Sequence, residues 1–234
     1  AHSAFWRANF QRQAEQAWLR HLAAEPADRF ITMYPILFRF GSFELRSFSL
    51  AMMAAVLTAL IISSKRAPKH GITGEQLQSA ALWMVIAGVL GARIAYIVQY
   101  LPHFLENKSE LFTLRFEGLT SFGGIIGGGL VLIVFCRRNK ISLRSMLDTV
   151  GLPFLIAHAI GRVGCFLNGC CYGIACETSP PGYWVVNERG FFLPAQLYDT
   201  AMTLAGAVIL WQLEKRQLKP GASFGWMLIL YGVS

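Results

Sequence analysis

Hydrophobic positions fall in long uninterrupted blocks along most of the chain, separated by short polar segments. A run of about 20 apolar residues is long enough to cross the hydrocarbon core of a bilayer as one helix. We therefore expect an all-α fold, a polytopic transmembrane helix bundle with about six visible spans and a seventh span beyond Ser234. The expected spans lie at about 45–64, 77–101, 119–136, 146–167 and 195–213, and from about 222 onward.

The first 25 residues follow a different pattern. Apolar side chains recur every four positions, which places them on one face of an amphipathic helix: Trp6, Phe10, Ala14, Trp18 and Leu22. Such a helix can lie flat at the lipid interface or dock on a partner protein complex, and both interpretations of residues 1–25 stay open. We expect an amphipathic N-terminal extension at 1–30 and a transmembrane domain at 31–234.

Composition agrees with a lipid environment, since 54% of the residues are hydrophobic and only 15% are charged. A soluble domain usually carries about 25% charged residues. The net charge of +8 is concentrated in loops after the first, third and fifth blocks, at Lys65, Arg66, Lys69, Arg137, Arg138, Lys140, Arg144, Lys215, Arg216 and Lys219. Because cytoplasmic loops are enriched in Lys and Arg, we expect these loops inside and the N-terminus on the non-cytoplasmic side. The clusters follow membrane boundaries and form no single basic face, so no nucleic-acid partner is expected.

Two arginines lie within or close to apolar blocks, at Arg93 and Arg162. A charge at membrane depth is costly unless it is paired, reaches the headgroups or faces a wet cavity. Arginine also binds phosphate through two parallel hydrogen bonds. Gly161 and Gly164 leave space beside Arg162, which favours an anionic lipid headgroup there. For Arg93, headgroup binding and a position near a helix end stay equally open.

Glycines gather in the third block, at Gly123, Gly124, Gly127, Gly128 and Gly129. Small residues let a neighbouring helix or a lipid headgroup approach the backbone closely. Helix packing is the commoner cause of such a cluster, and both interpretations stay open.

Four cysteines lie within twelve positions, at Cys165, Cys170, Cys171 and Cys176. Their spacing is not a paired CxxC pattern and no His lies nearby in the loop, so we interpret them as packing residues. We expect neither a metal site nor a cofactor, and a disulfide involving Cys176 stays open if that side of the membrane is oxidising. His158 has no carboxylate at helical spacing except Asp148, and we interpret it as a packing residue.

The run GRVGCFLNGCCYG at 161–173 resembles the signature of the prolipoprotein diacylglyceryl transferases, in a variant with cysteines where other members have Asn and Glu. Asp148 and Pro153 precede it at the family's spacing. Further segments resemble family motifs in the family's order, at 34–49, 91–96, 118–127 and 194–198. The resemblance covers about 34–234 and implies a membrane enzyme of the bacterial inner membrane.

The resemblance also implies a reaction. A cysteine thiol of a prolipoprotein attacks the glyceryl carbon of phosphatidylglycerol, a thioether forms and glycerol phosphate leaves. It implies phosphatidylglycerol, or another anionic phospholipid, as a partner. The expected headgroup-binding residues are Arg162, Arg93, Gly123, Gly124, Asn168 and Gly173.

The chain departs from the family pattern where a proton acceptor is expected. Phe48 occupies a position that is usually Tyr, and Phe122 one that is usually His. Phe can neither donate nor accept a proton, and general acid–base help is typically worth about 10²–10⁴ in rate. Two readings follow. In the first, a catalytically impaired homologue acts as a lipid-binding or structural subunit of a membrane complex. In the second, an active transferase uses another acceptor, with candidates at Tyr34, Tyr96, Tyr172 and Cys170.

Overall fold

The structure is a computed structural model that describes residues 34–40, 43–101, 121–176, 183–185, 190–216 and 218–234. The amphipathic helix expected at 1–25 and the loop expected at 102–118 lie outside these residues. The chain forms two compact units. Unit 1 comprises Ala1–Ser47 and Cys165–Gln196, and unit 2 comprises Phe48–Gly164 and Leu197–Ser234.

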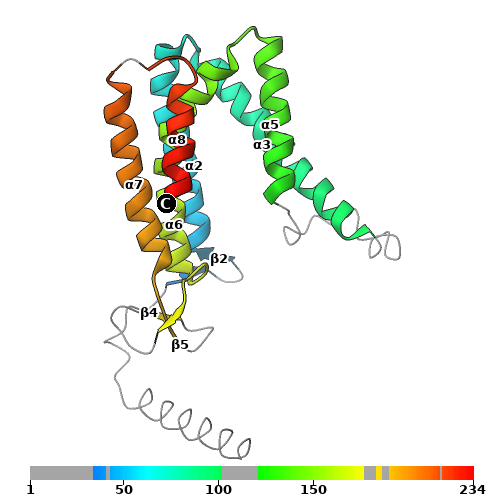
Figure 1. The fold of residues 1–234 in the computed structure, drawn as a ribbon. Coiled ribbons are helices and arrows are strands. Elements are labelled where there is room, and N and C mark those ends of the chain that lie inside the picture. Colours follow the sequence, from blue (N-terminus) through cyan, green and yellow to red (C-terminus); the bar gives the residue numbers. More distant parts are fainter. Residues whose placement is uncertain (1–33, 41–42, 102–120, 177–182, 186–189, 217) are drawn as a thin grey trace, which may run out of the picture. The chain divides into compact units, whose positions relative to one another are not determined.

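Six α-helices form the described part of the chain's helical framework, and each overlaps one expected span (Figure 1): α2 (Ser47–Arg66), α3 (Gly74–Gln99), α5 (Ser121–Arg138), α6 (Leu143–Asn168), α7 (Ala195–Glu214) and α8 (Ala222–Val233). A short 3₁₀ helix, η2 (Ala67–His70), follows α2. Within the residues that the structure describes, three segments are long and apolar enough to cross a membrane, at Ser47–His70, Gly74–Gln99 and Leu143–Asn168, and α8 is a shorter apolar helix. The helical framework is therefore as predicted, while six spans remain a prediction.

Unit 1 also contains strands, so the prediction of an all-α fold is wrong in this respect. Strands β1 (Ile36–Phe40) and β2 (Phe43–Arg46) form an antiparallel hairpin. A second sheet has the strand order β3-β5-β4, from β3 (Ala175–Cys176), β5 (Gly190–Phe192) and β4 (Tyr183–Val185). Strands of two to five residues are too short for a period-two pattern to distinguish them from loop.

Helices α3 and α5 lie side by side in unit 2 (Figure 1) and touch through their backbones. A Cβ atom added to Gly123 would collide with the carbonyl oxygen of Gly91 and lie 2.5 Å from Ala95 Cβ. A Cβ atom added to Gly127 would lie 2.5 Å from the carbonyl oxygen of Ala87. Only glycine permits such an approach, so the glycine-rich face of α5 serves helix packing.

Two apolar clusters hold the remaining helices of unit 2 together. One joins α6, α7 and α8 through Leu152, Leu155, Ala207, Leu210 and Met227. The other joins η2, α3, α5 and the start of α6 through Ala67, Ile72, Leu77, Ala80, Leu132, Cys136 and Met146.

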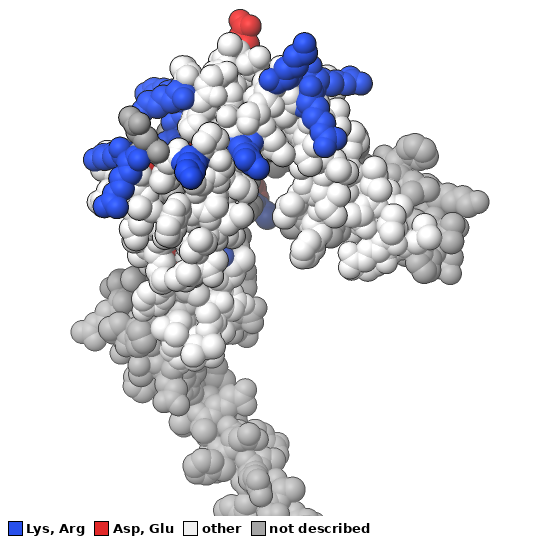
Figure 2. All heavy atoms as spheres, turned by 45° about the horizontal axis from the view of Figure 1, so that its top comes forward, with Lys and Arg blue, Asp and Glu red and all other residues white. Residues whose placement is uncertain are grey.

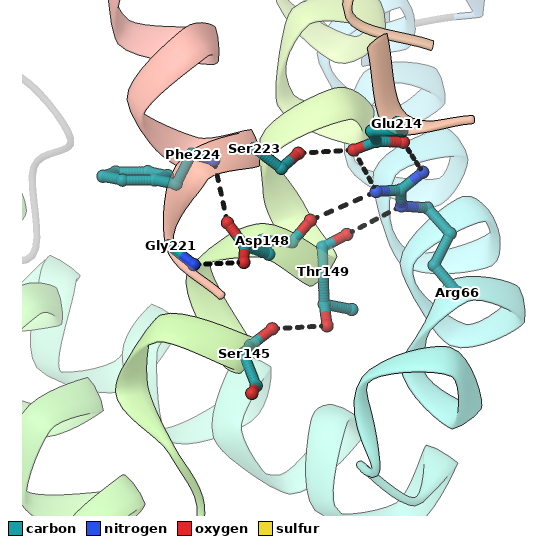
Figure 3. A network of polar contacts seen from close by, with 8 residues as sticks. All are labelled: Arg66, Ser145, Asp148, Thr149, Glu214, Gly221, Ser223 and Phe224. Carbon is teal, nitrogen blue, oxygen red and sulfur yellow. Dashed lines mark hydrogen bonds and ion pairs between the residues drawn. The ribbon is translucent and has the colours of Figure 1, made fainter. Parts of the chain in front are cut away.

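A polar network centred on Arg66 crosses the bundle at one end of α6 (Figure 3). Pro153 lies inside α6 and has no N–H group, so the carbonyl of Thr149 lacks its usual helical donor. Arg66 replaces that donor, since its Nε donates to Thr149 O at 3.2 Å and its Nη2 donates to Asp148 O at 3.2 Å. The Glu214 carboxylate accepts from Nη1 at 2.7 Å and from Nη2 at 2.6 Å. One side chain thus joins α2, α6 and α7.

The same network fixes the start of α8 (Figure 3). The Asp148 carboxylate accepts hydrogen bonds from the backbone N–H of Gly221 at 2.5 Å and of Phe224 at 2.9 Å. These are the donors that a helix N-terminus leaves without partners, and a carboxylate there also suits the helix dipole. The Ser223 hydroxyl donates to Glu214, which links the α8 start to the Arg66 pair.

Lysine and arginine side chains gather at the end of unit 2 where this network lies (Figure 2). The last turns of α2, η2 and α5 are basic, at Lys65, Arg66, Lys69, Arg137 and Arg138. Shared placement at one end is what the predicted cytoplasmic loops require. The direction in which the chain crosses the membrane remains a prediction.

Candidate functional site

The Arg162 side chain lies on α6 within unit 2 and is 24% exposed. Its Nε makes an ion pair with the carboxylate of Asp199 on α7. The geometry of that contact is not that of a hydrogen bond, so the attraction is mainly between charges. Among the described residues, none hydrogen-bonds to either Nη nitrogen of Arg162. The guanidinium is therefore held at one side and presents its two outer nitrogens to a further acceptor.

The Asp199 carboxylate is the centre of this site, and sequence reasoning missed it. Its Oδ1 accepts a hydrogen bond from Thr203 Oγ1 at 3.0 Å, and its Oδ2 lies 3.4 Å from His158 Nε2. The Asp199 side chain is only 17% exposed, so its charge needs these partners. The available signal was a carboxylate inside an apolar block, which is a functional hint in a membrane protein.

His158 is more than the packing residue that we expected. It lies one helical turn before Arg162, so both side chains project from the same face of α6 toward Asp199. Its ring also packs edge-on against Tyr231 of α8, with ring centroids 5.0 Å apart. The packing is present, but a His–carboxylate pair can also accept and hold a proton.

Arg93 contacts an aromatic ring on its own helix. Its guanidinium carbon lies 5.9 Å from the centre of the Tyr96 ring on the same helix, within reach of a cation–π contact. No contact between Arg93 and either Arg162 or Asp199 occurs in the described ranges. The expectation that both arginines hold one headgroup therefore gains no support from their contacts.

The glycines expected to make room for a headgroup differ in how closely protein atoms approach them. Gly123 abuts Gly91, and a Cβ atom on Gly124 would lie 3.5 Å from the carbonyl oxygen of Gly88. Beside Arg162 the two glycines differ: outside the neighbouring helix backbone, no atom of the described residues lies within 4 Å of a Cβ added to Gly161, whereas one added to Gly164 would lie 2.5 Å from Ala51 Cβ. Gly161 therefore has room beside it, and Gly123 and Gly164 lie in close helix contacts, while headgroup binding by Gly123 and Gly124 stays a prediction.

The aromatic residues at the usual proton-acceptor positions lie in different surroundings. Phe122 on α5 is 76% exposed. Phe48 on α2 is half-buried, and its ring would lie 3.8 Å from a Cβ on Gly164. Neither ring offers a proton-accepting atom at its position.

Two further predicted residues, Asn168 and Gly173, belong to unit 1. Asn168 ends α6 and is half-buried, and its side chain makes no hydrogen bond to the part of the chain that the structure describes. Gly173 donates its N–H to Leu193 O at 2.9 Å, and a Cβ there would lie 3.1 Å from Leu193 Cβ. A side chain at Gly173 would therefore be tight in this loop, and headgroup binding by Asn168 and Gly173 stays a prediction.

Apolar helices that bury an arginine–carboxylate pair define a membrane protein with an internal polar site. The chain belongs to the prolipoprotein diacylglyceryl transferase family, whose model matches residues 35–234. This confirms the resemblance that the motifs predicted.

Two relatives illustrate the similarity. The chain is 29% identical over 206 residues to the phosphatidylglycerol–prolipoprotein diacylglyceryl transferase of Clostridium tetani (strain Massachusetts / E88), covering 86% of this chain and 82% of the relative. It is 28% identical over 205 residues to the enzyme of the same name from Streptococcus pyogenes serotype M5 (strain Manfredo), covering 85% and 79%. Those names give the relatives' lipid donor and protein acceptor.

Proposed function

We propose that the protein binds the phosphate of phosphatidylglycerol, or of another anionic phospholipid, at Arg162 in the bacterial inner membrane. The observation that carries the proposal is the orientation of the guanidinium. Its Nε is engaged by Asp199, and no described residue hydrogen-bonds to its two Nη nitrogens. Arginine binds phosphate oxygens through two parallel N–H groups, and the space beside Gly161 is open to a ligand.

Asp199 sets the charge of this site in addition to holding the Arg162 side chain. A lone guanidinium among apolar helices is costly, and the nearby carboxylate offsets much of that cost while no lipid is bound. A bound phosphate adds a second negative charge near Asp199. Because Thr203 and His158 also contact the carboxylate, they can keep it in place when the phosphate arrives.

We further propose that the protein lacks the family's usual route for removing the thiol proton, because Phe48 and Phe122 have no proton-accepting group. Without a replacement, the chain would act as a lipid-binding or structural subunit of a membrane complex. Residues 1–25 would then provide the docking segment, on the non-cytoplasmic side.

A second candidate function is an active transferase with a relocated proton acceptor. The His158–Asp199 pair favours it, since the two side chains lie 3.4 Å apart and His158 is one turn from Arg162. An imidazole next to a carboxylate is a common general base.

Lipid binding is tested by native mass spectrometry of the full chain released from nanodiscs with equal phosphatidylglycerol and phosphatidylcholine. We expect the wild type to retain phosphatidylglycerol, and Arg162→Ala to lower its occupancy by about 10–100-fold, the worth of a charge-assisted hydrogen bond. Arg39→Ala is the control, because that side chain is 64% exposed. Equal occupancy in all three proteins would refute the headgroup site.

Catalysis is tested separately, in cells depleted of their own transferase. Restored lipidation of a reporter prolipoprotein would establish the second candidate, and its loss in His158→Ala would identify the acceptor. No lipidation at normal expression, with phosphatidylglycerol still bound, would establish the subunit reading.

A further inference from the structure

Three cysteines that sequence reasoning assigned to packing converge at the end of α6 in unit 1. The sulfur atoms of Cys165, Cys170 and Cys171 all lie within 4.8 Å of one another. No disulfide joins them in the described residues. Thiolate groups grouped in this way are ligands for soft or borderline cations such as Zn²⁺.

The distances agree with a zinc site to within a small adjustment. Tetrahedral zinc binds sulfur at about 2.3 Å, which sets neighbouring sulfurs about 3.8 Å apart. The observed limit of 4.8 Å therefore requires each pair to close by at most about 1 Å. Rotation about the Cα–Cβ bond moves a sulfur by more than that, so the backbone can remain in place.

The backbone of this loop is held by hydrogen bonds of its own, and the Cys170 thiol also donates to Cys165 O at 3.7 Å. The N–H of Cys170 donates to Cys165 O at 3.1 Å, and Gln196 Nε2 donates to Cys170 O at 2.6 Å. Cys171 has a φ of 61°, in the left-handed region that side chains other than Gly, Asn and Asp rarely adopt. The fold therefore fixes two adjacent cysteines with their sulfurs close to that of Cys165.

We propose that Cys165, Cys170 and Cys171 bind one Zn²⁺ ion and leave its fourth position open for a thiol from outside the chain. Three protein ligands with an open fourth position are typical of catalytic zinc, whereas structural zinc sites are closed by four. Zinc has no redox chemistry, so it can hold a thiol without oxidising it. Of the cluster, Cys171 is exposed, which leaves the site accessible.

The thiol-binding role rests on the transferase reading proposed above, but the metal site itself does not. Zinc deprotonates a thiol that coordinates it, and the proton passes to solvent. The bound thiolate would then attack the glyceryl carbon of phosphatidylglycerol. One S–C bond forms, the C–O bond to phosphate breaks, and its electron pair leaves with glycerol phosphate. No acceptor at positions 48 or 122 would be required.

Metal binding is tested on the full chain in detergent micelles, kept reduced and stripped by a chelator. We expect one Zn²⁺ per chain on reconstitution, and a sulfur-to-metal charge-transfer band when Co²⁺ replaces zinc. Serine at Cys165, Cys170 and Cys171 together should abolish the band. Each single serine should weaken zinc affinity by more than the roughly 10–100-fold that losing an outer-shell partner costs.

Cys176→Ser is the matched control, because Cys176 lies in β3 of the same unit and outside the cluster. It should keep the band. A wild type without the band, or a band unchanged in the triple variant, would overturn the metal site. The metal site would also be overturned if protein purified from cells without reductant has a mass that shows a disulfide between two of the three cysteines. Thermal unfolding in micelles checks that the serine variants are folded. A second test uses the wild type alone: the band should disappear when chelator is added and return when Co²⁺ is supplied again.

The open position is tested by adding a lipobox peptide to the Co²⁺-loaded chain. A peptide with Cys should change the band, and the same peptide with Ser should not. Identical spectra would overturn the thiol role and leave the metal site standing. If metal and thiol both bind but cells show no lipidation, the hypothesis of an active transferase is wrong and the zinc site is still supported.

Discussion

Arg66 of α2 and Glu214 of α7 form a two-pronged ion pair, with Nη1–Oε2 and Nη2–Oε1 distances of 2.7 and 2.6 Å (Figure 3). Their side chains are only 14% and 16% exposed. Removing one member of a buried pair leaves a charge without compensation, which typically costs about 3–5 kcal/mol. We therefore expect Glu214→Gln to lower the free energy of unfolding in micelles by that order. Arg66→Met combined with Glu214→Met removes both charges but should recover only part of the loss, because the Thr149 carbonyl then has no donor.

The control for this experiment is the ion pair between Arg39 and Glu44, whose side chains are 64% and 33% exposed. Exposed pairs contribute about 0–1 kcal/mol. Glu44→Gln should therefore have little effect, and a loss equal to that of Glu214→Gln would show that burial does not set the cost.

Asp148 should control the order of α8. Its carboxylate accepts from the N–H groups of Gly221 and Phe224 and is 3% exposed. Loss of such a cap costs about 0.5–2 kcal/mol. In Asp148→Ala, hydrogen exchange of amides in Ala222–Val233 should accelerate, while exchange in α3 should not. Asp148→Asn keeps an acceptor oxygen and should give a smaller change; uniform acceleration in all helices would argue against a local cap.

Glycines on one helix should differ sharply in their tolerance of a methyl group. A Cβ on Gly127 would lie 2.5 Å from Ala87 O, whereas none of the atoms considered lies within 4 Å of a Cβ on Gly129. We expect Gly127→Ala to lower the midpoint of thermal unfolding in micelles. Gly129→Ala should leave it unchanged or raise it slightly, since alanine is worth up to about 1 kcal/mol over glycine in a helix. Similar midpoints for both variants would contradict the α3–α5 contact.

Asp199 should make stability depend on the lipid. Asp199→Asn leaves the Arg162 guanidinium without its carboxylate, a loss of the order of 3–5 kcal/mol for a buried pair. An anionic phospholipid can supply the missing charge, whereas a neutral one cannot. We expect the variant to unfold at lower temperature than wild type in phosphatidylcholine micelles and to recover part of the difference when phosphatidylglycerol is added. Recovery of equal size with both lipids would show that Arg162 does not select a headgroup charge.

The helices of this fold were predictable because their apolar blocks are long and their boundaries are charged. The block expected at about 45–64 became α2 at Ser47–Arg66. The short strands of unit 1 were not predictable, since their pairing depends on loops that bring Ala175 to Phe192. No periodic signal in two or three residues encodes such a pairing.

Of the Arg162–Asp199 ion pair, the sequence pointed to Arg162 but not to Asp199. Arg162 was recognisable as a charge in an apolar block. Asp199 and His158 are 41 positions apart, and their contact depends on which faces of α6 and α7 pack together. The cysteines show the same limit. Their spacing matches no zinc pattern, and a left-handed residue at Cys171 brings the sulfurs together in space.

Pro153 has a consequence for how the protein is made. It leaves α6 with a backbone oxygen that lacks an internal donor, and such an oxygen is expensive in hydrocarbon. The Arg66 side chain supplies that donor from α2. Helix α2 precedes α6 in the chain and so leaves the ribosome first. We therefore expect α6 to be fully stable in the membrane only once α2 is inserted. In a newly made chain with a misplaced α2, the Thr149 carbonyl would have no donor, and quality-control proteases would meet a less stable α6.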